Sequence, residues 1–205
     1  MHATVVYESM FGNTCAVAAA VAAGLADGGT DTELLPVADA PLTMRARTGL
    51  LVIGAPTHAA GIPAPRTRTD AGFWAQADDP LTPRVGIREW LDAVHGDARA
   101  VRVATFDTRL RRPTKPGSAA NAALLELGRR GFTLVAAPES FWVGGMTGPL
   151  LPGEVERARA WGVALARTTG ARASSAAASA SAPASASAVT LDGAPLRAAP
   201  MPRPT

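Results

Sequence analysis

Segments with the composition of buried strands alternate with segments of helical periodicity along this chain, and that alternation limits the fold more than any other feature. Strand-like apolar runs occupy residues 3–7, 32–36, 50–53, 100–106 and 132–136, the last one resuming at 140–143. Helical patterns occupy residues 13–25, 83–95, 118–130 and 154–167. The alternation predicts a parallel sheet with right-handed crossovers and helices on both of its faces.

The spacing of apolar residues predicts which helix faces are buried. Within 83–95, residues at i, i+3, i+4 and i+7 share one apolar face: Ile87, Trp90, Leu91 and Val94. Within 154–167, the inward face is expected to hold Val155, Ala158, Gly162 and Leu165. Arg157 and Arg159 are then expected to face outward.

Two segments lack such patterns. Residues 55–82 read as a long proline-rich loop, and loops of this length inside a domain are usually functional or mobile. From residue 168 the composition changes, and residues 173–188 are an Ala/Ser/Pro tract. That tail cannot bury enough apolar surface to offset the entropy of ordering. We therefore expect a single domain over residues 1–167 and a low-complexity, disordered tail over 168–205.

Charge and cysteine content exclude several classes of protein. The 20 Lys and Arg residues exceed the 17 Asp and Glu residues by little, and they are scattered except for a run at 109–115. Nucleic acid is therefore not expected as a partner. Cys15 is the only cysteine, so neither an intramolecular disulfide nor a cysteine metal site is expected. No signal peptide pattern is present, and the longest apolar stretch, 15–26, is too short to span a bilayer. A cytoplasmic location is the simplest interpretation.

The segment that carries the strongest chemical signal follows the first predicted strand. A short polar turn leads into a helix, whose first N–H groups lack internal partners and whose dipole is positive at that end. A phosphate dianion suits this position. Ser9 and Thr14 offer hydroxyls, Asn13 offers an amide, and Gly12 permits close approach of the backbone. The alternative is a plain strand–turn–helix in which Ser9 serves only as a helix cap.

At these residues the sequence resembles the flavodoxin family, whose phosphate loop reads [ST]-x-[ST]-G-N-T. Ser9, Gly12, Asn13 and Thr14 match, with Met10 between them, while Phe11 replaces a hydroxyl residue. The loss of one hydrogen bond to the phosphate would weaken FMN binding by about 1–3 kcal/mol. The strings YESMFGNT, TFDTR and GPL-x-x-GE, at 7–14, 105–109 and 148–154, are similar to those of actinobacterial flavodoxin-domain proteins. The resemblance covers residues 3–167 and implies a three-layer fold with a five-stranded sheet in the order 2-1-3-4-5.

The resemblance also implies where the flavin ring would lie, between the loops after the third and fourth strands. The predicted contact residues are Pro56, Thr57, His58, Ala59 and Gly61 in the first loop, and Thr105, Phe106, Asp107 and Arg109 in the second. The backbone amides of Thr57, His58 and Asp107 are expected at the pyrimidine edge. Neither loop carries the Trp or Tyr pair that is typical of short-chain flavodoxins.

Several other side chains have two interpretations. His58 either contacts the ring or relays a proton, or it is simply exposed to solvent. Trp74 either closes over the flavin or anchors its loop, the second being favoured. Phe141 and Trp142 either line the pocket rim or belong to the core, and the core is favoured. Trp90 and Trp161 are expected to be packing residues, and Cys15 is given no catalytic role.

Arg109, Arg111 and Arg112 suggest an effect on redox potential. A cation about 6 Å from the ring, at an effective dielectric of ~20, would stabilise the anionic hydroquinone by about 3 kcal/mol. That corresponds to a potential raised on the order of 100 mV. The alternative is a solvated basic loop without influence on a flavin.

These observations favour an FMN-binding redox protein that transfers electrons to a protein partner or reduces a small acceptor such as a quinone. If it is an enzyme, it is expected to be an FMN-dependent oxidoreductase of the NAD(P)H or quinone reductase type, without catalytic side chains or metal. The alternative is a flavodoxin-like domain without flavin that acts as an interaction or regulatory module. The chain lacks a Gly-x-Gly-x-x-Gly motif, a Walker lysine, the paired acids of a receiver domain and a Gly-x-Ser-x-Gly elbow.

Overall fold

A computed structural model describes residues 1–44, 48–73, 85–98, 100–111 and 116–180, with side chains as far as Gly170. Its main sheet contains, in spatial order, β2 (Asp31–Pro36), β1 (His2–Tyr7), β4 (Thr48–Pro56), β6 (Arg102–Leu110) and an edge made of β7 (Thr133–Leu134) and β8 (Glu139–Val143). All neighbouring strands are parallel. The predicted order 2-1-3-4-5 is therefore confirmed.

The fifth strand is broken, as the sequence suggested. β7 pairs with the start of β6 at Arg102 and Val103, and β8 pairs with its end from Phe106 to Leu110. The short strands β3 (Thr43–Met44) and β5 (His95–Gly96) form a separate parallel pair. A 3-10 turn, Val37–Asp39, follows β2.

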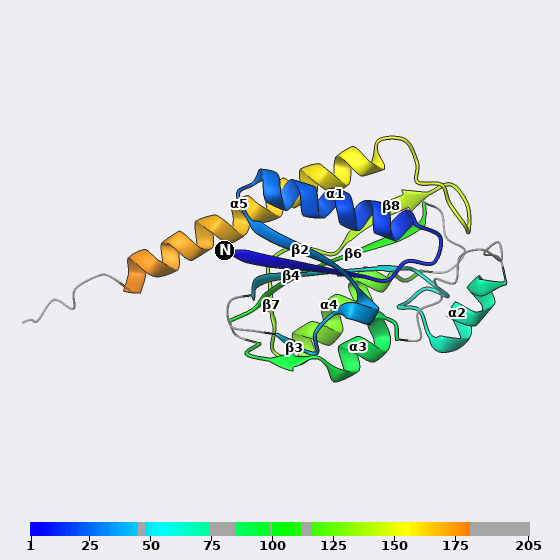
Figure 1. The fold of residues 1–205 in the computed structure, drawn as a ribbon, viewed down its shortest axis with the longest axis horizontal. Helices are drawn as coiled ribbons and strands as arrows, with labels where there is room; N and C mark the ends of the chain where they lie inside the picture. Colours follow the sequence, from blue (N-terminus) through cyan, green and yellow to red (C-terminus); the bar gives the residue numbers. More distant parts are fainter. Residues whose placement is uncertain (45–47, 74–84, 99, 112–115, 181–205) are drawn as a thin grey trace, which may run out of the picture.

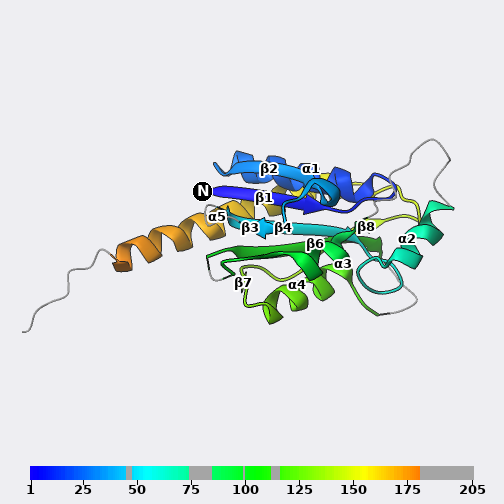
Figure 2. The same cartoon turned by 60° about the horizontal axis from the view of Figure 1, so that its bottom comes forward.

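Helices cover both faces of the sheet (Figure 1). α1 (Asn13–Asp27) and α5 (Glu154–Ala180) lie on one face, and α3 (Ile87–Ala93) and α4 (Ala119–Arg129) lie on the other, as the rotated view in Figure 2 also shows. α2 (Pro65–Gly72) lies beyond the carboxyl ends of the strands. This three-layer arrangement agrees with the predicted fold class. In the part of the chain that the structure describes, no helix is both long and apolar enough to cross a membrane.

The strands divide their side chains between two cores because successive residues point to opposite faces. Val6, Ile53 and Val103 pack toward α3 and α4, with buried Trp90. Val5 and Val52, their counterparts on the other face, pack toward α1 and α5. The predicted apolar face of α3 is confirmed, since Ile87, Trp90, Leu91 and Val94 are all buried.

α1 and α5 approach each other closely through two glycines. A Cβ atom on Gly24 would lie 2.0 Å from the carbonyl oxygen of Arg159, and one on Gly162 would lie 2.3 Å from that of Val21. The predicted inward position of Gly162 is confirmed. Trp161 packs edge-on against Phe106 and Phe141 in the same layer, which confirms its packing role.

The last helix differs from the prediction at its first turn. Val155 is exposed, and Glu154 is buried instead, where its carboxylate accepts the N–H of Trp142 at 2.9 Å. Arg157 does not simply face solvent, because it pairs with Glu139 and Glu154 and stacks over the Phe141 ring at 4.4 Å. The inward positions of Ala158 and Leu165 are confirmed.

The same helix also continues past residue 167 to Ala180. Alanine is the strongest helix former, and the local propensity of this Ala-rich segment explains the extension. The rest of the tail, 181–205, lies outside the described residues. The division into a domain and a tail at residue 167 remains a prediction.

Three further boundaries differ from those read in the sequence. The helix expected over 83–95 begins at Ile87, with Gly86 as its N-cap. The Gly86 N–H donates to the Glu89 carboxylate at 2.9 Å, and residues 83–84 lie outside the described residues. The expected loop over 55–82 contains α2, which starts at Pro65, a favoured first helical position. β6 runs on to Leu110, so the string 105–109 is strand rather than loop.

Candidate functional site

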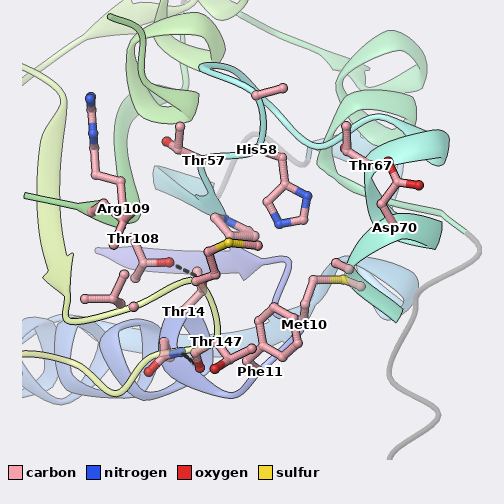
Figure 3. Close-up of a pocket in the computed structure, with 18 residues that line it drawn as sticks. Met10, Phe11, Thr14, Thr57, His58, Thr67, Asp70, Thr108, Arg109 and Thr147 are labelled. Atoms are coloured by element: carbon pink, nitrogen blue, oxygen red, sulfur yellow. Dashed lines mark hydrogen bonds between the residues drawn. The ribbon is translucent and has the colours of Figure 1, made fainter. Parts of the chain in front are cut away.

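A cavity of about 330 Å³ opens at the carboxyl ends of the central strands. Its walls come from the segments after β1, β4 and β8, from α2, and from the end of β6 (Figure 3). Parallel sheets bind ligands at this end, where the strand order reverses. Nine of the predicted site residues line it: Met10, Phe11, Asn13, Thr14, Pro56, Thr57, His58, Ala59 and Arg109.

The loop after β1 has the geometry of an anion site. Gly12 is the N-cap of α1 and adopts φ +81°, a left-handed conformation that favours glycine. A Cβ atom placed on it would meet nothing within 4 Å, so the space above the loop is open. The Ser9 hydroxyl oxygen is buried and has no hydrogen-bond partner among the described residues. Buried hydroxyls are rarely left unsatisfied, so this one fits a ligand acceptor.

Two side chains of this loop connect it to its neighbours. The Thr14 hydroxyl lies 2.7 Å from that of Thr108 at the end of β6, and both residues are buried. The Asn13 amide donates to the carbonyl oxygen of Thr147 in the loop after β8, at 2.9 Å. Figure 3 shows both contacts at the floor of the pocket. The loop is thus held against the end of β6 and the segment after β8.

The turn after β4 is built differently. Thr57 donates its N–H to the carbonyl oxygen of Thr108 at 2.9 Å, and His58 donates its own to Gly61 at 3.0 Å. Of the three amides expected at the pyrimidine edge, those of Thr57 and His58 therefore donate to protein carbonyls, and that part of the prediction is corrected. The turn bends sharply because Ala59 and Ala60 adopt φ +47° and +70°, which is costly for residues with a Cβ.

His58 lies in the pocket wall rather than in open solvent. Its ring lies between Thr57 and Thr67 on the side of the pocket facing Met10 (Figure 3). Burial lowers the pKa of the His58 imidazole, and the charge of Arg68 lowers it further, against a hydrogen bond with the Thr67 backbone that favours the charged form. The ring is therefore neutral at pH 7 and able to both donate and accept one hydrogen bond.

Of the residues predicted in the second loop, Thr105, Phe106 and Asp107 do not line the cavity. They lie within β6, and their side chains are buried against the helices that cover the sheet. Thr105 and Asp107 face α4, and Phe106 packs toward α5. The N–H of Asp107 is placed inside the sheet, between β4 and β8. Ser9, Gly12 and Gly61 are also outside the lining set. Their roles in binding remain predictions.

Asp107 has a clear structural function. Its Oδ2 accepts hydrogen bonds from the Thr57 hydroxyl at 2.8 Å, the Ser118 hydroxyl at 2.5 Å and the Ala120 N–H at 3.2 Å. The Thr57 hydroxyl in turn accepts the Ala119 N–H at 2.9 Å. One buried carboxylate thus joins the turn after β4 to the first turn of α4.

Arg109 lies at the edge of the pocket opposite Asp70 (Figure 3). Its Nε atom is buried and makes no hydrogen bond with the described residues. Arg111 is exposed and is not on the lining. Arg112 and Trp74 lie outside the described residues, so the predictions about them remain predictions.

Phe11 is the one Phe, Tyr or Trp residue among the residues found to line the cavity. Phe141 is fully buried and packs against Phe106, so its assignment to the core is confirmed. Trp142 is half-buried and lies off the lining. The pocket is bordered instead by methionine, leucine, valine and threonine side chains.

Half of the lining residues were not predicted: Thr67, Asp70, Ala71, Thr108, Leu110, Val143, Gly145, Met146 and Thr147. The α2 residues had a usable signal, since proline at position 65 favours a helix start. Leu110 lies beyond the string 105–109, in the part of β6 that the sequence did not indicate. Thr108 lies within that string but was not among the predicted contacts. The loop after β8 also follows a parallel strand, and its Gly144-Gly145 pair marks a turn at that edge.

No protein-family model matches the sequence, and no curated protein matches it. Solved structures do match its fold. A flavodoxin from the domain Archaea aligns with a TM-score of 0.58 and 16% identity, over 83% of this chain and 99% of that one. Flavodoxin 1 from Bacillus cereus aligns with a TM-score of 0.59 and 18% identity, over 82% of this chain and 98% of that one. The flavodiiron protein from Giardia intestinalis aligns with a TM-score of 0.56 and 18% identity, over 85% of this chain and 37% of that one. The protein therefore has a flavodoxin-like fold.

Proposed function

We propose that this protein binds FMN in the pocket at the carboxyl ends of its strands and acts as a redox protein. It passes electrons to a protein partner or reduces a small acceptor such as a quinone. The observation that supports this most is the loop 9–14, where a buried hydroxyl without a partner adjoins the open N-terminus of α1.

The residues of this loop fit a phosphate group. Gly12 leaves room for an anion above the backbone, and the first turn of α1 contains no acidic residue that would repel it. The N–H groups at a helix N-terminus lack intrahelical acceptors and bind anions well. The Ser9 hydroxyl would supply one further hydrogen bond. Phe11 supplies none, which fits moderate rather than very tight binding.

The rest of the pocket fits an aromatic ring system. A volume of about 330 Å³ is within the range of small-molecule sites, about 300–1,000 Å³. Met10, Phe11 and Met146 offer apolar surface that excludes water, and neutral His58 offers a hydrogen bond. Bound FMN supplies reversible one- or two-electron chemistry, while the protein binds and orients it.

The hydroxyls at the site support electron transfer over substrate-specific catalysis. Thr57 donates to the buried Asp107 carboxylate, and Thr14 is bonded to Thr108. Each hydroxyl is held in a structural hydrogen bond. The Asp107 oxygen that accepts from Thr57 also accepts from the Ser118 hydroxyl and the Ala120 N–H, so it acts as a fixed acceptor rather than as a free general base. An activated nucleophile needs an adjacent general base within hydrogen-bond reach.

The experiment is the visible absorption spectrum of the purified full chain, before and after addition of FMN and desalting. We expect a retained flavin spectrum at one FMN per chain. Replacing Ser9 by Ala should lower retention, because it removes a buried hydroxyl that has no hydrogen-bond partner among the described residues. Ser140→Ala, on β8 and off the pocket lining, is the matched control.

A colourless protein that retains no added FMN would contradict the proposal. The fold would then serve an interaction or regulatory role, the alternative that the sequence left open.

A further inference from the structure

α2 forms one wall of the pocket although it buries little apolar surface. Thr67, Asp70 and Ala71 line the cavity. Of its eight residues, Arg68 and Ala71 are the buried ones. A helix this short and polar is not stable by itself, and a single buried alanine contributes little hydrophobic stabilisation. Another interaction must hold this wall in place.

The other buried residue is a charged one. The Arg68 side chain is 3% exposed, which is rare for an arginine unless it is paired. Its Nη2 lies 2.7 Å from Oε2 of Glu89 on α3, and its Nη1 donates to the carbonyl oxygen of Pro63 at 3.2 Å. Nη1 also lies 3.7 Å from Oε1 of Glu8. One guanidinium thus joins α2 to α3 and to the end of β1.

Glu8 and α3 are fitted around this guanidinium. The Glu8 carboxylate is fully buried, and its Oε2 accepts the N–H of Ile87 at 2.8 Å. A Cβ atom on Gly86 would lie 2.2 Å from Nη1 of Arg68 and 2.7 Å from Oε2 of Glu8. The absence of a side chain at Gly86 therefore makes room for the cluster.

The cluster is joined to the proposed flavin site through two chain segments. Glu8 is the residue before Ser9, so the same chain segment carries the buried carboxylate and the anion loop. On α2, Arg68 lies between Thr67 and the pair Asp70 and Ala71, the three residues of this helix that line the cavity. A shift of the guanidinium would move the wall that α2 forms, and it would change the charge that helps to lower the pKa of His58.

We propose that Arg68 is a positioning residue for the flavin pocket, fixing α2 against Glu8 and Glu89 so that the wall 67–71 is formed before FMN binds. The inference rests on the proposed function for the identity of the ligand. The position of α2 itself is measurable without any ligand, so the two can fail separately.

The test uses the full chain and two readouts: hydrogen exchange of peptides covering 65–72 without ligand, and FMN affinity by flavin fluorescence. Arg68→Met removes the charge at similar length, and Arg66→Met is the control, since Arg66 is exposed on the same helix. Because Arg68→Met leaves Glu8 buried and unpaired, it can unfold the protein. The double variant Glu8→Gln/Arg68→Met removes both charges and keeps the experiment interpretable.

We expect exchange in 65–72 to become about tenfold faster in both Arg68 variants, with exchange in α1 unchanged. FMN affinity should fall about tenfold or more, and by less than about twofold in Arg66→Met. Arg68→Lys should retain part of the slow exchange in 65–72 and part of the FMN affinity, because lysine keeps the charge but lacks the forked donors of the guanidinium.

Wild-type exchange in 65–72 after Arg68→Met would overturn the proposal. Faster exchange with unchanged FMN affinity would overturn it as well, because the wall would not matter for binding. If the wild-type protein binds no FMN, the proposed function fails, and exchange alone decides whether Arg68 positions α2.

Discussion

The two ends of the pocket are built in different ways. At the loop after β1, Gly12 leaves open space and Ser9 keeps a buried hydroxyl without a partner. At the turn after β4, the N–H groups of Thr57 and His58 are already bonded within the protein. The first end has a hydroxyl donor that is free to bind a ligand. The second end would contact a ligand mainly through its surface and through the neutral His58 imidazole.

This difference indicates where binding free energy would come from. An anion gains from preset N–H groups and the helix dipole, with little rearrangement of the loop. The ring end depends on walls held by distant contacts, such as those of Asp107 with α4 and of Arg68 with α3. We therefore expect changes at Gly12 to act directly on phosphate affinity. Changes at the residues that hold the walls, such as Arg68, should instead lower affinity by displacing those walls.

The largest effect is expected from Gly12→Asp. An added carboxylate about 5 Å from a phosphate, at an effective dielectric of ~20, would cost about 3 kcal/mol per phosphate charge. FMN affinity should fall by at least about a hundredfold in a fluorescence titration. Gly29→Asp is the matched control, since Gly29 has φ +79° and equally open surroundings at the far end of α1. Equal losses in both variants would show that the backbone, not the anion site, was affected.

The next effect concerns Arg109, whose buried Nε has no described partner at the pocket edge. A cation about 6 Å from the ring would stabilise reduced, anionic FMN by about 3 kcal/mol at a dielectric of ~20. Arg109→Gln should lower the midpoint potential on the order of 100 mV in a dye-equilibrated reduction. Arg111→Gln, at an exposed position, should change it much less. An unchanged potential in Arg109→Gln would remove the tuning role.

A smaller effect is expected from the pH dependence of stability. Burial raises the pKa of Glu8 from 4.5 to about 6, although the N–H of Ile87 and the charge of Arg68 oppose the shift. The folded state therefore favours the protonated carboxyl, and stability falls as the pH rises from 4.5 through 6. The loss amounts to about 2 kcal/mol.

Urea unfolding at pH 4.5 and pH 7 measures this effect. Glu8→Gln should match the wild type at pH 4.5 and exceed its stability at pH 7 by up to about 2 kcal/mol. Glu156→Gln, at an exposed position of α5, is the control. A Glu8→Gln variant that is less stable than wild type at pH 7 would show that the ionised carboxylate stabilises the fold.

The smallest effect is expected at the turn after β4. Ala59 and Ala60 both adopt left-handed conformations, which cost about 1–2 kcal/mol for a residue with a Cβ. Ala60→Gly should raise the free energy of unfolding by up to about 1 kcal/mol, net of the entropy of glycine. The same change at Ala19, exposed within α1, should lower it by about 1 kcal/mol. Destabilisation by both changes would mean that the turn stores no strain.

The sequence located the loop 9–14 at the pocket more readily than it located the opposite wall, for a physical reason. The loop 9–14 is formed by consecutive residues whose strand, turn and helix signals are local. The opposite wall is assembled from the turn after β4, α2 and the end of β6, which are far apart in the chain. Because β6 continues to Leu110, its side chains alternate between the two faces through this region, and Thr108 rather than Asp107 points toward α1. Strand propensity did not indicate that β6 extends this far.

Buried charges were the least predictable part. Nothing in the spacing of Glu8, Arg68 and Glu89 indicates that they meet, because each comes from a different element. The strand order and helix layers, in contrast, followed from the hydrophobic pattern and the resemblance at the first loop. The extension of α5 to Ala180 shows local helix propensity exceeding what the composition of the tail suggested.

The most direct test of the central claim compares FMN with riboflavin, which lacks the phosphate, in parallel fluorescence titrations of the wild-type chain. If the loop 9–14 holds the phosphate, FMN should bind at one per chain and about a hundredfold or more tighter than riboflavin, as several charge-assisted hydrogen bonds would provide. Equal affinity for the two ligands, or binding of neither, would contradict a pocket organised around that loop.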